Sequence, residues 1–99
     1  MQSARESIEI ELDRITTRTT SLNLGRLEKC SPIIHTCAQQ IVDLTFSRLR
    51  ELPDIATPAI TAQLVVVVRD YLTASESNPD PDRDELVAEL LKNLRRDLP

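Results

Sequence analysis

The stretch "QLVVVVRDYL", residues 63–72, decides between a helical and a sheet fold, because four consecutive valines are also typical of a buried strand. When residues are placed at 100° steps, as in an α-helix, one face is entirely apolar and consists of Ile60, Leu64, Val67, Val68 and Tyr71. A strand would not explain the neighbouring Ala59 and Ala62, and its apolar residues would not alternate. We predict a helix, with a fully buried strand as the alternative, since short apolar runs are ambiguous.

Four sites in the sequence carry the signature of a helix start. Ser31-Pro32, Thr57-Pro58 and Asp80-Pro81 each place a capping residue before a proline, which is favourable at the first helical position. Ser3 is followed three residues later by Glu6, which is the spacing of a capping box. Together with the apolar periodicity that follows each start, these sites predict helices at about residues 3–20, 32–52, 58–74 and 81–98.

Three further segments are assigned from their local patterns. In the first helix Ile8, Ile10 and Leu12 alternate with acids as they would in a strand, but acids precede arginines, and this order favours a helix. The segment "SLNLGRLEKC", residues 21–30, is expected to be a loop or a helix end, with Gly25 as a C-terminal cap. The polar segment "SESNPDPDRD", residues 75–84, is expected to be a flexible loop.

Composition bounds the fold class. Ninety-nine residues with 40% apolar and 28% charged content fit a single domain over residues 1–99. Phe46 and Tyr71 are the only aromatic residues, so the core must be aliphatic. The single glycine disfavours tight β-hairpins and fits helices with short connections. We therefore predict an all-α fold: an antiparallel four-helix bundle that forms a dimer.

The expected dimer follows from an excess of aliphatic side chains in the second and third helices. A helix with two neighbours needs an apolar stripe of roughly 100–140°, and both helices exceed it. Exposed aliphatic patches of a few hundred Å² are typical of interfaces, and a two-fold axis is the simplest arrangement. The side chains least explained by a bundle core, and therefore the expected partner contacts, are Val65, Val66 and Leu72, with Ile10, Leu22 and Leu24 as second choices.

The charges suggest two alternative functions. The net charge is −4, with five acids and five bases in residues 1–30, four and three in residues 31–74, and seven and four in residues 75–99. Because no basic stripe dominates, nucleic-acid binding by a small transcriptional regulator is only an alternative, with the contacts Arg14, Arg18, Arg48 and Arg50. The acidic last quarter indicates a second alternative, an acidic inhibitor or immunity-type protein that binds another protein.

Candidate chemistry is sparse. On a helix His35 and Cys37 point about 200° apart and cannot share a metal ion. Cys30 and Cys37, two turns apart at roughly 10 Å, are too distant for a disulfide. The sequence has no Gly-rich phosphate loop and no nucleophile elbow. We therefore expect no enzymatic activity, no catalytic residues, no cofactor and no metal site.

The longest apolar runs have five residues, far below the roughly 20 that span a bilayer. The charged N-terminal stretch lacks the apolar segment of a signal peptide. We expect a cytoplasmic protein with reduced thiols that does not bind membranes. The favoured function is a non-enzymatic helical module that associates with itself or with another protein.

Overall fold

The computed structural model describes residues 2–46 and 50–99, and within them it contains helices and no strand. The elements in chain order are α1 (Ala4–Thr20), α2 (Leu24–Thr45), the short 3₁₀ helix η1 (Thr57–Ala59), α3 (Ile60–Ser77) and α4 (Pro81–Asp97). The prediction of an all-α fold is confirmed, and the valine run is helical. The radius of gyration of 13.0 Å is that of a compact chain of this length.

The first and last helices begin where their caps predict. The Ser3 side chain accepts a hydrogen bond from the amide of Glu6 at 3.2 Å. The Asp80 carboxylate accepts one from the amide of Arg83 at 3.1 Å. Each bond satisfies one of the amides that a helix start leaves without an intrahelical partner, so the local sequence is sufficient to set these two starts.

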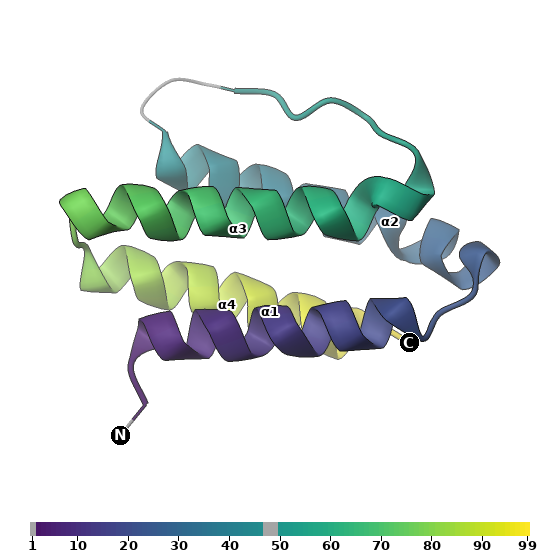
Figure 1. The fold of residues 1–99 in the computed structure, drawn as a ribbon, viewed down its shortest axis with the longest axis horizontal. Coiled ribbons are helices and arrows are strands. Elements are labelled where there is room, and N and C mark those ends of the chain that lie inside the picture. The colour runs from purple at the N-terminus through teal and green to yellow at the C-terminus, as the bar shows by residue number, and fades with distance from the viewer. Residues whose placement is uncertain (1, 47–49) are drawn as a thin grey trace.

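The predicted start and end of the second helix are wrong. α2 begins at Leu24, where the Asn23 side chain accepts from the Arg26 amide at 2.9 Å, and Gly25 lies in its first turn without a positive φ. Pro32 lies inside the helix, so Ser31 is not its cap. An interior proline removes one hydrogen bond and bends the helix, and Figure 1 shows the first turns of α2 inclined to the rest. α2 also ends at Thr45 rather than near residue 52.

Two further boundaries differ from the prediction. The pair Thr57-Pro58 forms η1 rather than the first turn of α3, and no side chain caps either element. α3 continues to Ser77, so the connection to α4 shrinks from the expected residues 75–84 to residues 78–80. Ser75 is buried and its hydroxyl accepts from Arg5 of α1, so packing against α1 stabilises the last turns of α3.

The four helices form two tightly packed parallel pairs. α1 packs mainly on α4, and α2 mainly on α3. The colour gradient of Figure 1 shows α1 and α4 running in one direction and α2 and α3 in the other. Antiparallel neighbours, α1 with α3 and α2 with α4, touch less extensively. The prediction of an antiparallel bundle is therefore not confirmed.

The length of the connection between α2 and α3 explains the parallel pairing. Eleven residues, 46–56, separate Thr45 from Thr57, and eleven extended residues span about 36 Å. The 18 residues of α3 are about 27 Å long. A connection of this length can therefore return along the whole bundle before α3 begins, and Figure 1 shows residues 50–56 running toward η1. Hydrogen bonds hold this connection to the helices: the Leu52 amide donates to Gln39 at 2.7 Å, and the Gln63 amide group donates to the carbonyl of Pro53 at 3.1 Å.

One aliphatic core joins all four helices. Its fully buried side chains include Ile8, Ile15, Ile34, Ile41, Leu64, Val68, Tyr71, Val87 and Leu91. Polar contacts also join the helices at this core: the Tyr71 hydroxyl donates to the buried carboxylate of Asp84, and the buried carboxylate of Glu11 accepts from Arg95. The second contact connects α1 with α4 and so stabilises the parallel arrangement of this pair.

Candidate functional site

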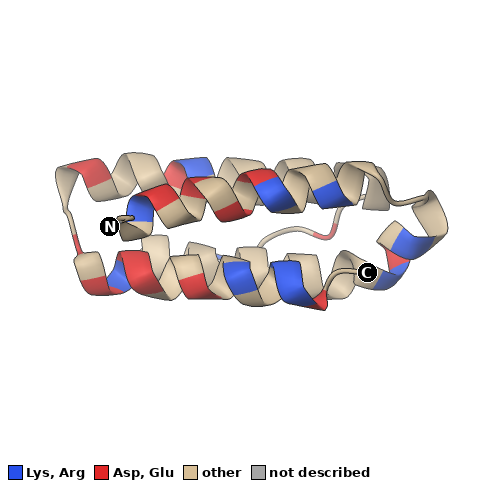
Figure 2. Ribbon diagram, turned by 90° about the horizontal axis from the view of Figure 1, so that it is seen from below, with Lys and Arg blue, Asp and Glu red and all other residues tan. Residues whose placement is uncertain are grey.

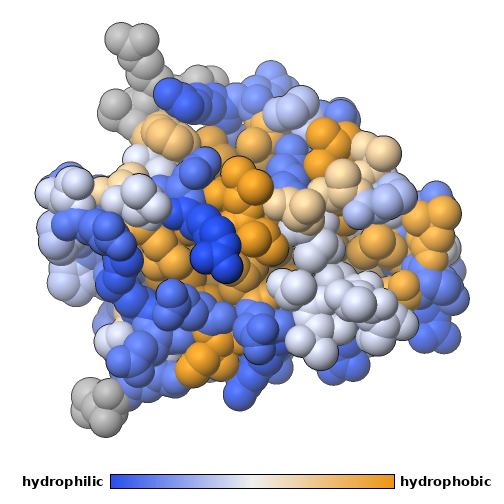
Figure 3. All heavy atoms as spheres, in the orientation of Figure 1, coloured by the Kyte–Doolittle hydropathy of each residue, from blue (hydrophilic) through white to orange (hydrophobic). Residues whose placement is uncertain are grey.

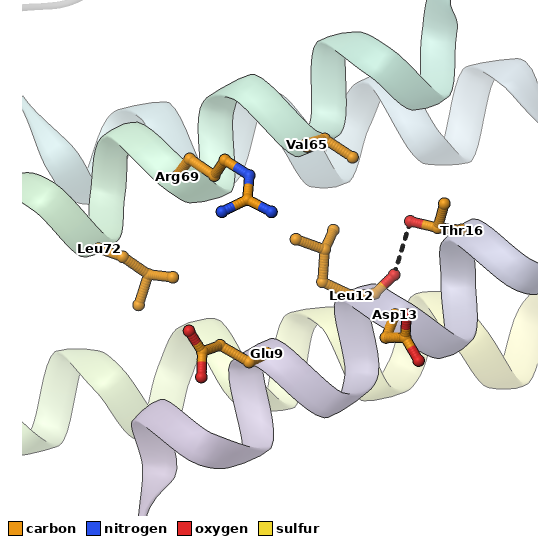
Figure 4. Close-up of a pocket in the computed structure, with 7 residues that line it drawn as sticks. All are labelled: Glu9, Leu12, Asp13, Thr16, Val65, Arg69 and Leu72. Atoms are coloured by element: carbon orange, nitrogen blue, oxygen red, sulfur yellow. Dashed lines mark hydrogen bonds between the residues drawn. The ribbon is translucent and has the colours of Figure 1, made fainter.

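A groove separates α1 from α3, because each of these helices packs more closely on its parallel partner than on the other. Its volume is about 290 Å³. Figure 4 shows side chains from both helices turned toward it. The lining residues of this α1/α3 groove are Glu9, Leu12, Asp13, Thr16, Val65, Arg69 and Leu72.

The α1/α3 groove combines an apolar floor with charges of both signs. On the face shown in Figure 3, hydrophobic residues lie exposed between hydrophilic ones. Leu12 is buried, and Val65 and Leu72 are partly buried against the core. Arg69 extends from α3 into the groove, while Glu9 and Asp13 belong to α1 on the opposite wall (Figure 4). Within the described part of the chain, Arg69 forms no ion pair. The Arg69 side chain is exposed to solvent.

A second groove lies between the other antiparallel neighbours, α2 and α4, and has a volume of about 370 Å³. Leu86 is 56% exposed there, although it is a large apolar side chain. Leu44 and Leu90 are partly buried at the same place. The remaining lining residues of this α2/α4 groove are Gln40, Asp43, Glu89 and Asn93.

The structure brings together only some of the expected contact residues. Val65 and Leu72 line the α1/α3 groove. Ile10, 37% exposed, lines an adjoining hollow that shares Glu9 and Asp13 with this groove.

The other three expected contacts lie elsewhere. Val66 is 58% exposed but lies on another side of α3, beside Phe46 and Leu52. Leu22 packs partly against the core from the first connection, and Leu24 is exposed at the start of α2. The six residues therefore do not form one patch.

Sequence reasoning missed the charged residues of the α1/α3 groove. Glu9 and Asp13 are four residues apart, as are Val65 and Arg69, so each pair occupies one helix face. This spacing is visible in the sequence. The sequence does not show that the two pairs face one groove, because the placement of α1 beside α3 depends on how the connection between α2 and α3 places α3.

The candidate nucleic-acid contacts fall into separate places. Arg14 and Arg18 line a hollow of about 430 Å³ together with Arg95, near the C-terminal ends of α1 and α4. Figure 2 shows basic residues concentrated at that end of the bundle and acidic residues toward the other. Arg50 follows α2, with its guanidinium 4.1 Å from the ring centroid of Phe46. Arg48 lies outside the described residues.

The buried thiols are poorly suited to chemistry. Cys30 and Cys37 are both buried, and both thiols are free. Burial raises the pKa of the Cys37 thiol to about 11, so it stays protonated at neutral pH and is a weak nucleophile. Nε2 of His35 lies 3.8 Å from a carboxylate oxygen of the exposed Asp54. Residues 2–46 and 50–99 contain no group of three potential ligands placed to hold a metal ion.

Comparison of the chain with protein-family models, with curated proteins and with solved structures found no match. Among the helices described, none has both the length and the apolar character needed to cross a membrane.

Proposed function

We propose that this chain is a non-enzymatic protein–protein interaction module that associates with a second copy of itself through the α1/α3 groove and the adjoining Ile10. The observation that supports the proposal most is the placement of Arg69 on one wall and of Glu9 and Asp13 on the other, above an apolar floor.

This distribution of charge is self-complementary. A two-fold axis brings the same patch of both copies together, so each surface must satisfy itself. Arg69 of one copy would then face the carboxylates of Glu9 and Asp13 in its partner, and the same pair of contacts would form twice. Leu12, Val65 and Leu72 would lose water at the centre. Such a surface favours a weak or transient dimer, because its seven lining residues are far fewer than the roughly 20–30 that each partner contributes to a stable complex.

The test is the molecular mass in solution across a concentration series, measured by sedimentation equilibrium. The expected result for the unaltered chain is a reversible shift from the 11.2 kDa monomer to a dimer. Arg69→Glu should weaken the dimer at least tenfold, because it places like charges opposite each other twice. Adding Glu9→Arg to it should restore association.

A matched control is Arg26→Glu, which makes the same charge change at an exposed position of α2 outside the groove. This variant should dimerise as the unaltered chain does. A chain that stays monomeric at millimolar concentration would contradict the proposal. So would equal effects of Arg69→Glu and Arg26→Glu.

One observation favours a second candidate function, the binding of nucleic acid. Arg14, Arg18 and Arg95 line one hollow together with a single acid, Asp13, and Ser21 and Thr17 offer hydroxyl groups beside them. Arg14 and Arg95 share the carboxylate of Glu11, which fixes both guanidinium groups. Arg18 makes no ion pair with the described residues. Guanidinium and hydroxyl groups are the usual donors to phosphate oxygens.

Binding of a random DNA duplex, measured by fluorescence anisotropy from 20 mM to 200 mM salt, tests this candidate. Association should weaken as salt rises, with a slope of about −0.9 per phosphate contacted. Arg18→Glu should weaken binding more than Arg50→Glu, because Arg50 lies away from the hollow. Absence of binding at the lowest salt concentration would exclude this function.

A further inference from the structure

The α2/α4 groove has a largely apolar lining, and it lies on the side of the bundle away from the α1/α3 groove. In Figure 1 α1 and α3 lie toward the viewer and α2 and α4 behind them. Leu44, Leu86 and Leu90 line the α2/α4 groove. A leucine that is 56% exposed, as Leu86 is, loses favourable hydrophobic burial unless another molecule covers it.

The face of α2 that lines this groove continues as a strip to Ile33, with the polar Gln40 between Ile33 and Leu44. Ile33 is 39% exposed and lies seven residues before Gln40 and eleven before Leu44. Residues at these spacings return to the same face of an α-helix. The strip from Ile33 to Leu44 is therefore about 16 Å long, or three helical turns. Its length and its leucines suit the apolar face of one short helix.

The charges around the α2/α4 groove select the partner. Asp43 of α2 and Glu89 of α4 stand at its rim, and its described lining residues include no base. Two copies joined through this groove would bring four carboxylates together, which disfavours a homotypic contact. A partner with basic side chains beside its apolar stripe would instead form opposite-charge pairs with both rim residues.

We propose that the α2/α4 groove binds an amphipathic helix of a different protein, with leucine-like side chains on one face and lysine or arginine flanking it. The net charge of −4 would accelerate its capture at low salt. This binding does not rest on self-association, because the two grooves share no lining residue and lie on different faces. This proposal corresponds to the second alternative indicated by the sequence, an acidic inhibitor or immunity-type protein that binds another protein.

The probe is a designed fourteen-residue peptide with leucines at every third or fourth position and lysines at the others. A matched peptide carries glutamate in place of each lysine. Fluorescence anisotropy at low salt should show binding of the lysine peptide and none of the glutamate peptide. Leu86→Ser should weaken binding about tenfold, through loss of buried apolar area. Val66→Ser removes an equally exposed aliphatic residue outside this groove and should leave the affinity unchanged.

Charge reversal provides the sharper measurement. The double variant Asp43→Lys/Glu89→Lys should exchange the preference, so that the glutamate peptide binds and the lysine peptide does not. Amide chemical-shift changes should centre on Leu44, Leu86 and Leu90. The proposal is overturned if the lysine peptide fails to bind, if its shift changes centre on the α1/α3 groove, or if charge reversal leaves the preference unchanged. Arg69→Glu, which tests the α1/α3 groove, should not alter the affinity for the peptide. Peptide binding can therefore succeed or fail independently of the proposed dimer.

Discussion

Tyr71→Phe offers a direct test of how α3 and α4 are joined in the core. Tyr71 is 1% exposed, and its hydroxyl donates to the carboxylate of Asp84, which is 8% exposed. The substitution keeps the ring and removes one oxygen atom, so no large cavity forms. It leaves the Asp84 carboxylate buried without this donor. Hydrogen bonds to charged groups contribute about 1.5–3 kcal/mol, so we expect the free energy of unfolding to fall by about 2 kcal/mol.

Urea denaturation followed by circular dichroism measures this loss. A loss of about 2 kcal/mol lowers the melting temperature of a domain this size by about 8–16 °C. A double-mutant cycle with Asp84→Ala isolates the interaction between the two side chains. The sum of the stability losses of the two single variants should exceed the loss of the double variant by about 1.5–3 kcal/mol. A loss below about 0.5 kcal/mol for Tyr71→Phe, with a coupling of similar size, would show that the two groups do not meet.

Three other predictions concern stability and topology. Burial raises the pKa of Cys37 from 9.0 to about 11, so the folded state favours the protonated thiol. The free energy of unfolding should therefore hold its full value below pH 9 and fall as the pH rises toward 11. In thermal melts the Cys37→Ala variant should show a smaller fall over the same pH range. Gly25→Ala should stabilise the chain by about 0.5–1 kcal/mol in urea titrations, because Gly25 is helical and an added Cβ meets only the Asn23 side chain at an ordinary 3.6 Å. Destabilisation by this substitution would contradict a helical Gly25 and favour the C-terminal cap that the sequence suggested. Spin labels at residues 3 and 98 should lie more than about 25 Å apart, since α1 and α4 run parallel over 17 residues each; a separation near 10 Å would indicate the alternating antiparallel bundle instead.

The boundaries of the helices show how far local signals extend. Ser3 and Asp80 cap their helices as predicted, because each satisfies amides only a few residues away. At the start of α2 two local signals compete: Asn23 is a suitable cap, and so is Ser31 before Pro32. The structure favours Asn23, which adds two helical turns and buries Cys30 in the core. The burial of Cys30 depends on side chains far away in the sequence. The residues around Pro32 were therefore not enough to predict where α2 begins.

The candidate sites divide in the same way. The periodicity of residues 60–75 determined that the valine run is helical and that Val65 and Leu72 lie beside its buried stripe. Neither groove could be derived from that periodicity, because each groove forms between helices that are not consecutive in the chain.

The sequence by itself determined the number of helices, their aliphatic faces and the two cap-defined starts, because these depend on interactions within a few residues. Only the tertiary structure decided that α1 lies parallel to α4 and α2 parallel to α3. Helices of similar length and apolar character can pair in several ways, and the choice depends on the length of the connection between α2 and α3 and on contacts such as that between Glu11 and Arg95. That choice of partners opened the two grooves and placed their charges.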